Sequence, residues 1–300
     1  MIFVIEKGKY NVRFDSPKDH KKPVKYVFLV PFLVSFAALI VVGAMLISSF
    51  SSTKEENVWQ GLPIWQNFAK NGKKTMLVLG DYFVFNGLLP TGNAGVYRDF
   101  SINSEVEYEH LLDKNPELVQ VLSKSNLTYL SKMAVFCQSN IYKVFAQTGG
   151  EIDVKLSSDV QPDDLKEYNI IFVGNYKNMG IFENVVNDLN FSFGVSTATR
   201  QFIFSTDPCA EIFEAENTTN KENDYALVIH TKGFSDNHFL FFLSAQDIGN
   251  IAVVNQLTDP SYLGQFASDN LKDKEDDFKA LFEVEGIDKT DLACKLIRVE

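Results

Sequence analysis

Three apolar segments of the chain each end in a short run of glycine and polar residues, a pattern typical of ligand sites in α/β proteins. These runs are Gly80-Asp81, Gly174-Asn175 and Ser244–Gly249. In open α/β sheets, ligands bind beyond the carboxyl ends of the strands, so the three runs are expected to meet in one crevice. Helices are expected to start close to the second and third runs, and their free backbone N–H groups would favour a small anion.

The segment after Asp81 adds further polar side chains to this expected site. A plainer interpretation stays open, in which Asp81 and Asp247 are caps and the glycines serve turns. In that interpretation, Arg98 pairs with Asp99 or another neighbour. The candidate ligand-binding residues are Asp81, Arg98, Asp99, Asn103, Asn175, Ser244, Gln246, Asp247 and Gly249.

Established catalytic signatures are absent from the sequence, which contains no G-x-S-x-G, H-E-x-x-H, P-loop or C-x-x-C pattern. An enzymatic alternative is a divalent-metal site made by Asp81, Asp99 and Asp247, which would serve a hydrolase or transferase. His230 and His238 flank an expected hairpin and are interpreted as neutral surface side chains. The three cysteines show neither a disulfide framework nor a metal spacing. Three reduced or buried cysteines are favoured, and one bridge with a free thiol stays open. We therefore assign no catalytic residue, no metal ligand and no cofactor.

Hydrophobic periodicity predicts the elements that would position the candidate residues. Short apolar runs indicate buried strands, and apolar residues recurring at helical spacing indicate helices. The expected strands cover 75–79, 151–156, 169–173 and 238–243, and the expected helices cover 104–122, 127–147, 179–189, the segment from Gly249 through 257 and a short helix from Asp259-Pro260.

This alternation of strands and helices predicts an α/β fold with a three-layer, largely parallel sheet and an antiparallel β extension. The extension would come from the strand-like region 191–232 and from a final antiparallel pair at 278–285 and 292–299. The segment between Asp81 and Ser104 is expected to be a long loop, and long loops in compact domains are often functional.

The segment Tyr26–Phe50 holds 25 residues without a charge, enough for a transmembrane helix across roughly 30 Å of hydrocarbon. Residues 1–25 hold seven Lys/Arg and three acidic residues, a charge of +4. Because the whole chain carries −11 and the span is neutral, residues 51–300 carry −15. The positive short flank places the N-terminus in the cytoplasm and residues 51–300 outside it. Nucleic acid is not an expected partner, because the outer part is acidic and lacks a Lys/Arg cluster.

The expected organisation is a cytoplasmic tail (1–25), a transmembrane helix in the lipid bilayer (26–50), a juxtamembrane tether (51–74) and an extracytoplasmic α/β domain (75–300). Two tryptophans lie within the expected tether, in the sequence WQGLPIWQNF. They either sit at the membrane interface or pack on the domain. A protein partner in the membrane, or one that binds the tail, also stays open.

Several of these segments, taken in their order along the chain, are similar to segments of a known group of proteins. They read GDYFVFNG, YRDFSINS, NIIFVGN, DYALVIH, FLFFLSAQDIGN, DPSYL and FKALFEVEGID. In this order, over about residues 75–300, the chain resembles the extracytoplasmic C-terminal α/β domain of bacterial membrane-anchored proteins, some with a cytoplasmic winged-helix module. The resemblance implies a domain of binding-protein type and supplies no catalytic residues. Residues 1–25 are too short for a winged helix, so DNA binding is not carried over.

Together, these observations favour a single-pass membrane protein whose outer domain binds or senses a ligand, or interacts with a protein, without catalysis. The possible ligand is a small anion. The alternatives are the metal-dependent hydrolase or transferase described above and a structural subunit of an envelope complex.

Overall fold

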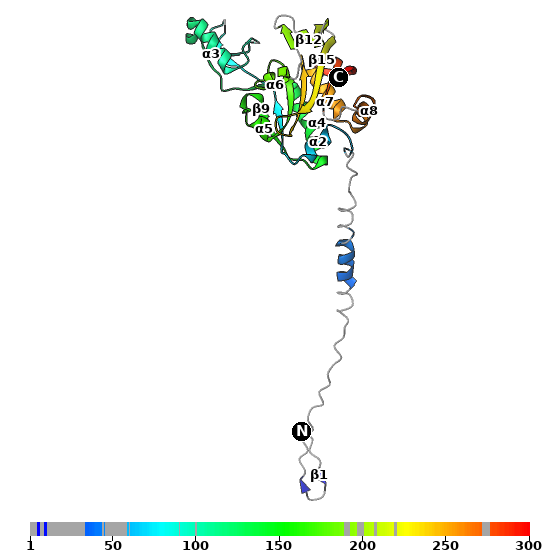
Figure 1. The fold of residues 1–300 in the computed structure, drawn as a ribbon. Helices are drawn as coiled ribbons and strands as arrows, with labels where there is room; N and C mark the ends of the chain where they lie inside the picture. Colours follow the sequence, from blue (N-terminus) through cyan, green and yellow to red (C-terminus); the bar gives the residue numbers. More distant parts are fainter. Residues whose placement is uncertain are drawn as a thin grey trace. The chain divides into compact units, whose positions relative to one another are not determined.

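The chain divides into two compact units, Met1–Glu55 and Glu56–Glu300 (Figure 1). In the first unit, β1 (Ile5–Glu6) pairs antiparallel with β2 (Lys9–Tyr10), and residues 34–43 are helical. Most of the expected span 26–50 lies outside the described residues, among which no helix is long and apolar enough to cross a membrane. The computed structural model describes residues 5–6, 9–10, 34–43, 45, 59, 61–89, 91–99, 101–188, 193–196, 201–206, 209–218, 221–271 and 277–300.

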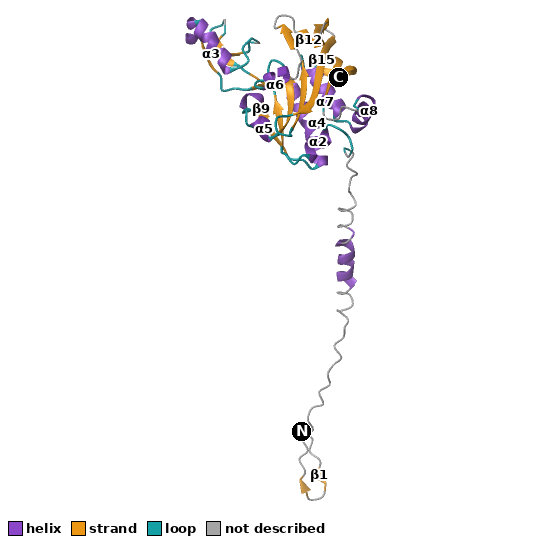
Figure 2. Ribbon diagram, in the orientation of Figure 1, coloured by secondary structure: helices purple, strands orange, loops and turns teal. Residues whose placement is uncertain are grey.

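The second unit is built on an eight-stranded mixed sheet (Figure 2). Four neighbouring strands run parallel, and an antiparallel group follows them on one side. In spatial order, the parallel strands are β9 (Ile152–Leu156), β3 (Thr75–Leu79), β10 (Asn169–Asn175) and β16 (His238–Ser244). The antiparallel strands are β15 (Lys221–Lys232), β17 (Phe278–Ile287) and β18 (Thr290–Val299), and β14 (Glu216–Thr218) pairs with β15 off this path.

Helices cover both faces of the sheet, which gives the predicted three layers. Alternate residues of β3 show the division, because Leu77 and Leu79 pack into one core cluster and Met76 and Val78 into the other. The first cluster is shared with α2 (Trp65–Lys70), α4 (Lys132–Thr148), α7 (Asp247–Leu257) and α8 (Pro260–Asn270). The second is shared with α5 (Asp164–Glu167) and α6 (Phe182–Asp188). Side chains with period two therefore fill two separate cores, as expected for a sheet buried on both faces.

The segment between β3 and α4, expected to begin with a long loop, instead forms an inserted module (residues 81–130) with its own small core of Phe85, Ile102 and Tyr108. Helix α3 starts as predicted after Ser104, whose hydroxyl accepts a hydrogen bond from the N–H of Glu107. The module contains β4 (Asp81–Tyr82), paired with β8 (Tyr129–Leu130), and a sheet of β5 (Phe85–Leu88), β6 (Ala94–Tyr97) and β7 (Leu122–Lys124). It also contains α3 (Glu105–Lys114) and the 3-10 helix η2 (Pro116–Gln120).

Part of the expected tether belongs to the α/β unit. Trp59, Trp65 and Phe68 are buried in the first core cluster. The indole of Trp65 donates to the carbonyl of Leu257 at 2.7 Å, which ties α2 to the end of α7. Of the two interpretations of the tryptophans, the structure shows packing on the domain, so the domain begins before Trp59 and not at residue 75.

Two other expectations are corrected. The region 191–232 does not extend the main sheet as a whole, because β11 (Phe193–Ser196), β12 (Gln201–Thr206) and β13 (Cys209–Glu214) form a separate antiparallel sheet. His230 is not a surface residue: it is fully buried, and its ring stacks on that of His238 with centroids 5.5 Å apart. Both rings also contact Phe68, so the pair closes the core beneath α2.

Candidate functional site

The parallel strands bring the three predicted runs to one edge of the sheet. Asn175 of β10 pairs in register with Ser244 of β16, and the N–H of Gly80 donates to the carbonyl of Val173 at 2.9 Å. The carboxyl ends of β3, β10 and β16 therefore lie side by side. This is the arrangement expected for parallel strands of one α/β sheet.

The Asp81 side chain binds the turn that directly follows the edge strand β9. Its Oδ1 accepts from the Ser157 hydroxyl at 2.8 Å and from the Ser158 N–H at 3.0 Å. Its Oδ2 accepts from the Ser158 hydroxyl at 2.8 Å. Both serines lie in the 3-10 helix η3 (Ser157–Asp159) directly after β9. The carboxylate therefore acts as a cap, as in the plainer interpretation.

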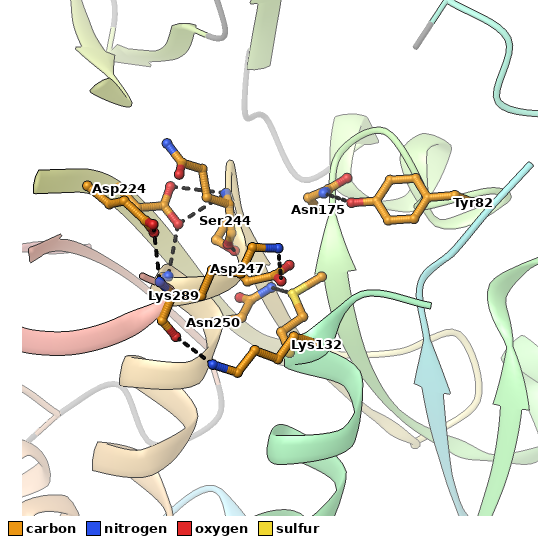
Figure 3. Close-up of polar contacts among 12 residues, drawn as sticks. Tyr82, Lys132, Asn175, Asp224, Ser244, Asp247, Asn250 and Lys289 are labelled. Carbon is orange, nitrogen blue, oxygen red and sulfur yellow. Dashed lines mark hydrogen bonds and ion pairs between the residues drawn. The ribbon is translucent and has the colours of Figure 1, made fainter. Parts of the chain in front are cut away.

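Tyr82 joins the inserted module to the end of β10. The Asn175 amide donates to the Tyr82 hydroxyl (Figure 3), and the Arg98 guanidinium lies 5.1 Å from the centre of the Tyr82 ring. Burial raises the pKa of Tyr82 to about 12. Arg98 also donates to the Asn103 side chain and to the carbonyl of Asp99. These side chains fix the module's position at the sheet edge.

Asp99 points to its own turn. Its Oδ1 accepts from the hydroxyl and the N–H of Ser101, at 2.7 and 2.9 Å. These two hydrogen bonds lower the pKa of the Asp99 carboxyl. Asp99 is thus used locally, and its contact with Arg98 is made by its backbone carbonyl.

The loop after β16 contains a carboxylate that the sequence argument missed. Asp224, at the start of the apolar part of β15, is fully buried. Its Oδ2 accepts from the N–H of Gly249 at 2.9 Å and its Oδ1 from the N–H of Tyr225 at 2.9 Å. The N–H groups of Ala245 and Gln246 also donate to it, at 3.1–3.2 Å.

The expected anion cradle at Ser244–Gly249 is therefore filled by the protein's own Asp224. The N–H groups of Ala245, Gln246 and Gly249, which were expected to help receive a ligand anion, are paired with this carboxylate instead. Gly249 is required here, because a Cβ at this position would lie 2.5 Å from Oδ2 of Asp224. Burial raises the pKa of Asp224 to about 8, and the four backbone N–H donors act in the opposite direction.

Asp247, the first residue of α7, forms an ion pair with Lys289 at 3.1 Å (Figure 3). The Lys132 ammonium donates to the carbonyl of Lys289 at 3.3 Å, so the first turns of α4 and α7 are joined through one residue of the β17–β18 turn. One turn further along α7, the amide of Asn250 donates to the carbonyl of Gly174 at 2.6 Å. The side chains of Asp247 and Asn250 at the β16 edge are thus engaged by other parts of the protein.

The three carboxylates Asp81, Asp99 and Asp247 do not assemble a metal site. Each has its own protein partners on a different element. Among the residues that the structure describes, no group of three or more His, Cys, Asp or Glu side chains is placed to hold a metal ion. The metal-dependent alternative therefore loses its ligand set.

A cavity of about 520 Å³ opens on the other side of the edge, between the ends of β3 and β10 and the inserted module. Of the predicted site residues, only Asp81 and Asn103 line it. The missed lining residues come from the inserted module, the β10–α6 loop, η3 and the start of α6. They include Ser157, Ser158, Tyr176, Lys177, Asn178 and Glu183. The position directly after a buried strand, the signal used for Asn175, could have indicated Tyr176, Lys177 and Asn178.

Comparison with known proteins identifies no relative: no family model, no curated protein and no solved structure matches this chain.

Proposed function

We propose that the α/β unit is a small-molecule binding domain whose ligand occupies the cavity between the strand ends of β3 and β10 and the inserted module. The observation that carries this proposal is the cavity itself. Its volume of about 520 Å³ is in the range of small-molecule sites, roughly 300–1,000 Å³. It also lies where α/β sheets usually bind ligands, beyond the carboxyl ends of parallel strands.

The proposed role is binding or sensing, without catalysis. At the described edge, the polar groups are mostly engaged with one another, as Asp81 is with Ser157 and Asp224 with the loop after β16. This arrangement supports a rigid receptor more than a set of reactive groups.

A thermal-shift screen of the full-length chain against sugars, amines, amino acids, small anions and nucleotides tests the binding role. Leu127→Trp places an indole at the cavity wall and should abolish any shift seen with the wild type. Val119→Trp is the matched control, because Val119 is equally exposed (58% against 59%) and lies outside the cavity lining. If no compound stabilises the wild type, or if Leu127→Trp responds like the wild type, the proposal fails.

We further propose that residues 26–50 anchor the chain in a bilayer, with residues 1–25 in the cytoplasm and the α/β unit outside. The support is the 25-residue uncharged segment and the charge of +4 before it against −15 after it. Protease added to sealed, right-side-out vesicles should digest the α/β unit and spare the tail. Digestion of the tail alone would reverse the orientation, and loss of the chain from washed membranes would remove the anchor.

A further inference from the structure

The cavity wall contains a buried hydrogen-bond donor that has no acceptor among the residues that the structure describes. Asn178 is 3% exposed and lines the cavity from the β10–α6 loop. Its Oδ1 accepts from the N–H of Asn175 at 2.8 Å, which fixes the orientation of the amide. Within the described part of the chain, its Nδ2 has no hydrogen-bond partner.

Two glycines leave space for the Asn178 amide. A Cβ on Gly80 would lie 2.3 Å from Oδ1 of Asn178, and a Cβ on Gly174 would lie 2.6 Å from the same atom. The side chain is therefore seated on the ends of β3 and β10. Leaving a buried donor unsatisfied costs roughly 1–3 kcal/mol, so a group that accepts from Nδ2 would be favoured.

The charge of the cavity limits which acceptor that group carries. Among its described lining residues are the carboxylates of Asp81, Glu105, Glu107 and Glu183, against one cation, Lys177. A ligand carboxylate or phosphate would be repelled by this surplus of negative charge. The glutamates at the opening are exposed, and Glu105 already pairs with Lys124 while Glu107 accepts from the N–H of Asn103. Because ionised carboxylates only accept hydrogen bonds, they favour a ligand that brings donors.

A hydroxyl group satisfies both demands, since it accepts from an amide and donates to a carboxylate without carrying a charge. The lining also includes the rings of Tyr82, Phe83 and Tyr176, which offer apolar faces to the carbon skeleton of a ligand. An ammonium group would suit the carboxylates but cannot accept from Asn178.

We propose that the cavity binds a neutral polyhydroxylated ligand of monosaccharide size, with one hydroxyl accepting from Asn178 and others donating to the carboxylates of Glu107 and Glu183. The proposal rests on the binding role assigned above and specifies its ligand class. Because Nδ2 is buried beneath the cavity wall, its contact with the hydroxyl requires an outward shift of the β10–α6 loop on binding.

Saturation-transfer NMR on the full-length chain, followed by titration, tests this class. The probes are glucose, galactose and mannose, together with the matching hexosamines and hexuronates. At least one neutral hexose should bind, and its hexuronate should bind at least tenfold more weakly. Asn178→Asp keeps the acceptor for Asn175 but removes the donor, and it should weaken the hexose at least tenfold.

Glu183→Gln, on the exposed opening of the cavity, is the second variant and guards against misfolding of Asn178→Asp. It should reduce the difference in affinity between the hexose and its hexuronate, because it removes one of the negative charges that repel the hexuronate. Tighter binding of a hexosamine or a hexuronate than of the neutral hexose would overturn the ligand class while leaving the binding role intact. The same holds if none of the nine probes binds but another compound of the wider screen does. If neither the nine probes nor any compound of the wider screen binds, both the ligand class and the binding role are overturned.

Discussion

Raising the pH from 5 to 7 should destabilise the wild-type α/β unit relative to the Asp224→Asn variant. The Asp224 carboxyl is fully buried, and burial raises its pKa from an ordinary value of 3.8 to about 8. Between these two values, the folded protein holds a proton that the unfolded chain has released. The unfolding free energy therefore falls as the pH rises, by about 1.4 kcal/mol per pH unit. Over two units the loss is about 3 kcal/mol.

The contribution of Asp224 is fully present below pH 4 and is lost as the pH rises through about 8, above which both states are ionised. Urea unfolding at half-unit steps from pH 5 to 9 measures it. The fluorescence of Trp59 and Trp65, the two tryptophans of the chain, reports unfolding because both are buried. Subtracting the unfolding free energy of Asp224→Asn from that of the wild type at each pH removes the contribution of the titrating groups that the two proteins share.

Parallel pH profiles of the two proteins would refute this reasoning. They would mean that Asp224 is already ionised at pH 5 in the folded state. Its four backbone N–H donors and the N-terminus of α7 would then outweigh the cost of burial. In that case Asp224→Asn should cost roughly 1–3 kcal/mol at every pH, because its NH₂ group would face buried N–H donors.

Two further predictions concern packing. Gly249→Ala should lower the unfolding free energy by roughly 1–3 kcal/mol in urea, because the new methyl group would overlap the Asp224 carboxylate. Gly264→Ala in α8 is its control and should be neutral or stabilising by up to about 1 kcal/mol, since the nearest atom lies 3.5 Å away. A chain that starts at residue 75 should fail to fold, as judged by circular dichroism, because it lacks the buried Trp59 and Trp65, each worth roughly 3–5 kcal/mol. A chain that starts at residue 56 should fold, and equal stability of the two would refute the new boundary.

Much of the central sheet follows from local sequence. The runs 75–79, 169–173 and 238–243 are each apolar after one polar first residue, and they become β3, β10 and β16, whose side chains are buried on both faces. A strand between two helical layers has no solvent face, so its composition alone identifies it. The final pair β17 and β18 was also predicted, since alternating patterns on both sides of a short turn indicate a hairpin.

The candidate site was predicted only in its location. Asp81, Asn175 and Ser244 lie at one edge as expected, because the carboxyl ends of parallel strands must meet there. The partners of these residues were not predictable. Asp224 reaches the loop after β16 only through the antiparallel pairing of β15 with β16, a contact across 25 residues to Gly249.

The sequence by itself determined the uncharged segment 26–50, the charge asymmetry around it and the buried parallel strands, because these depend on residue composition and short-range periodicity. Only the tertiary structure decided that the expected anion cradle is filled by Asp224, and that the open cavity lies instead beside Asn178. Both outcomes depend on which side chains from distant segments reach the same strand ends. That placement is set by long-range packing, and local patterns do not contain it.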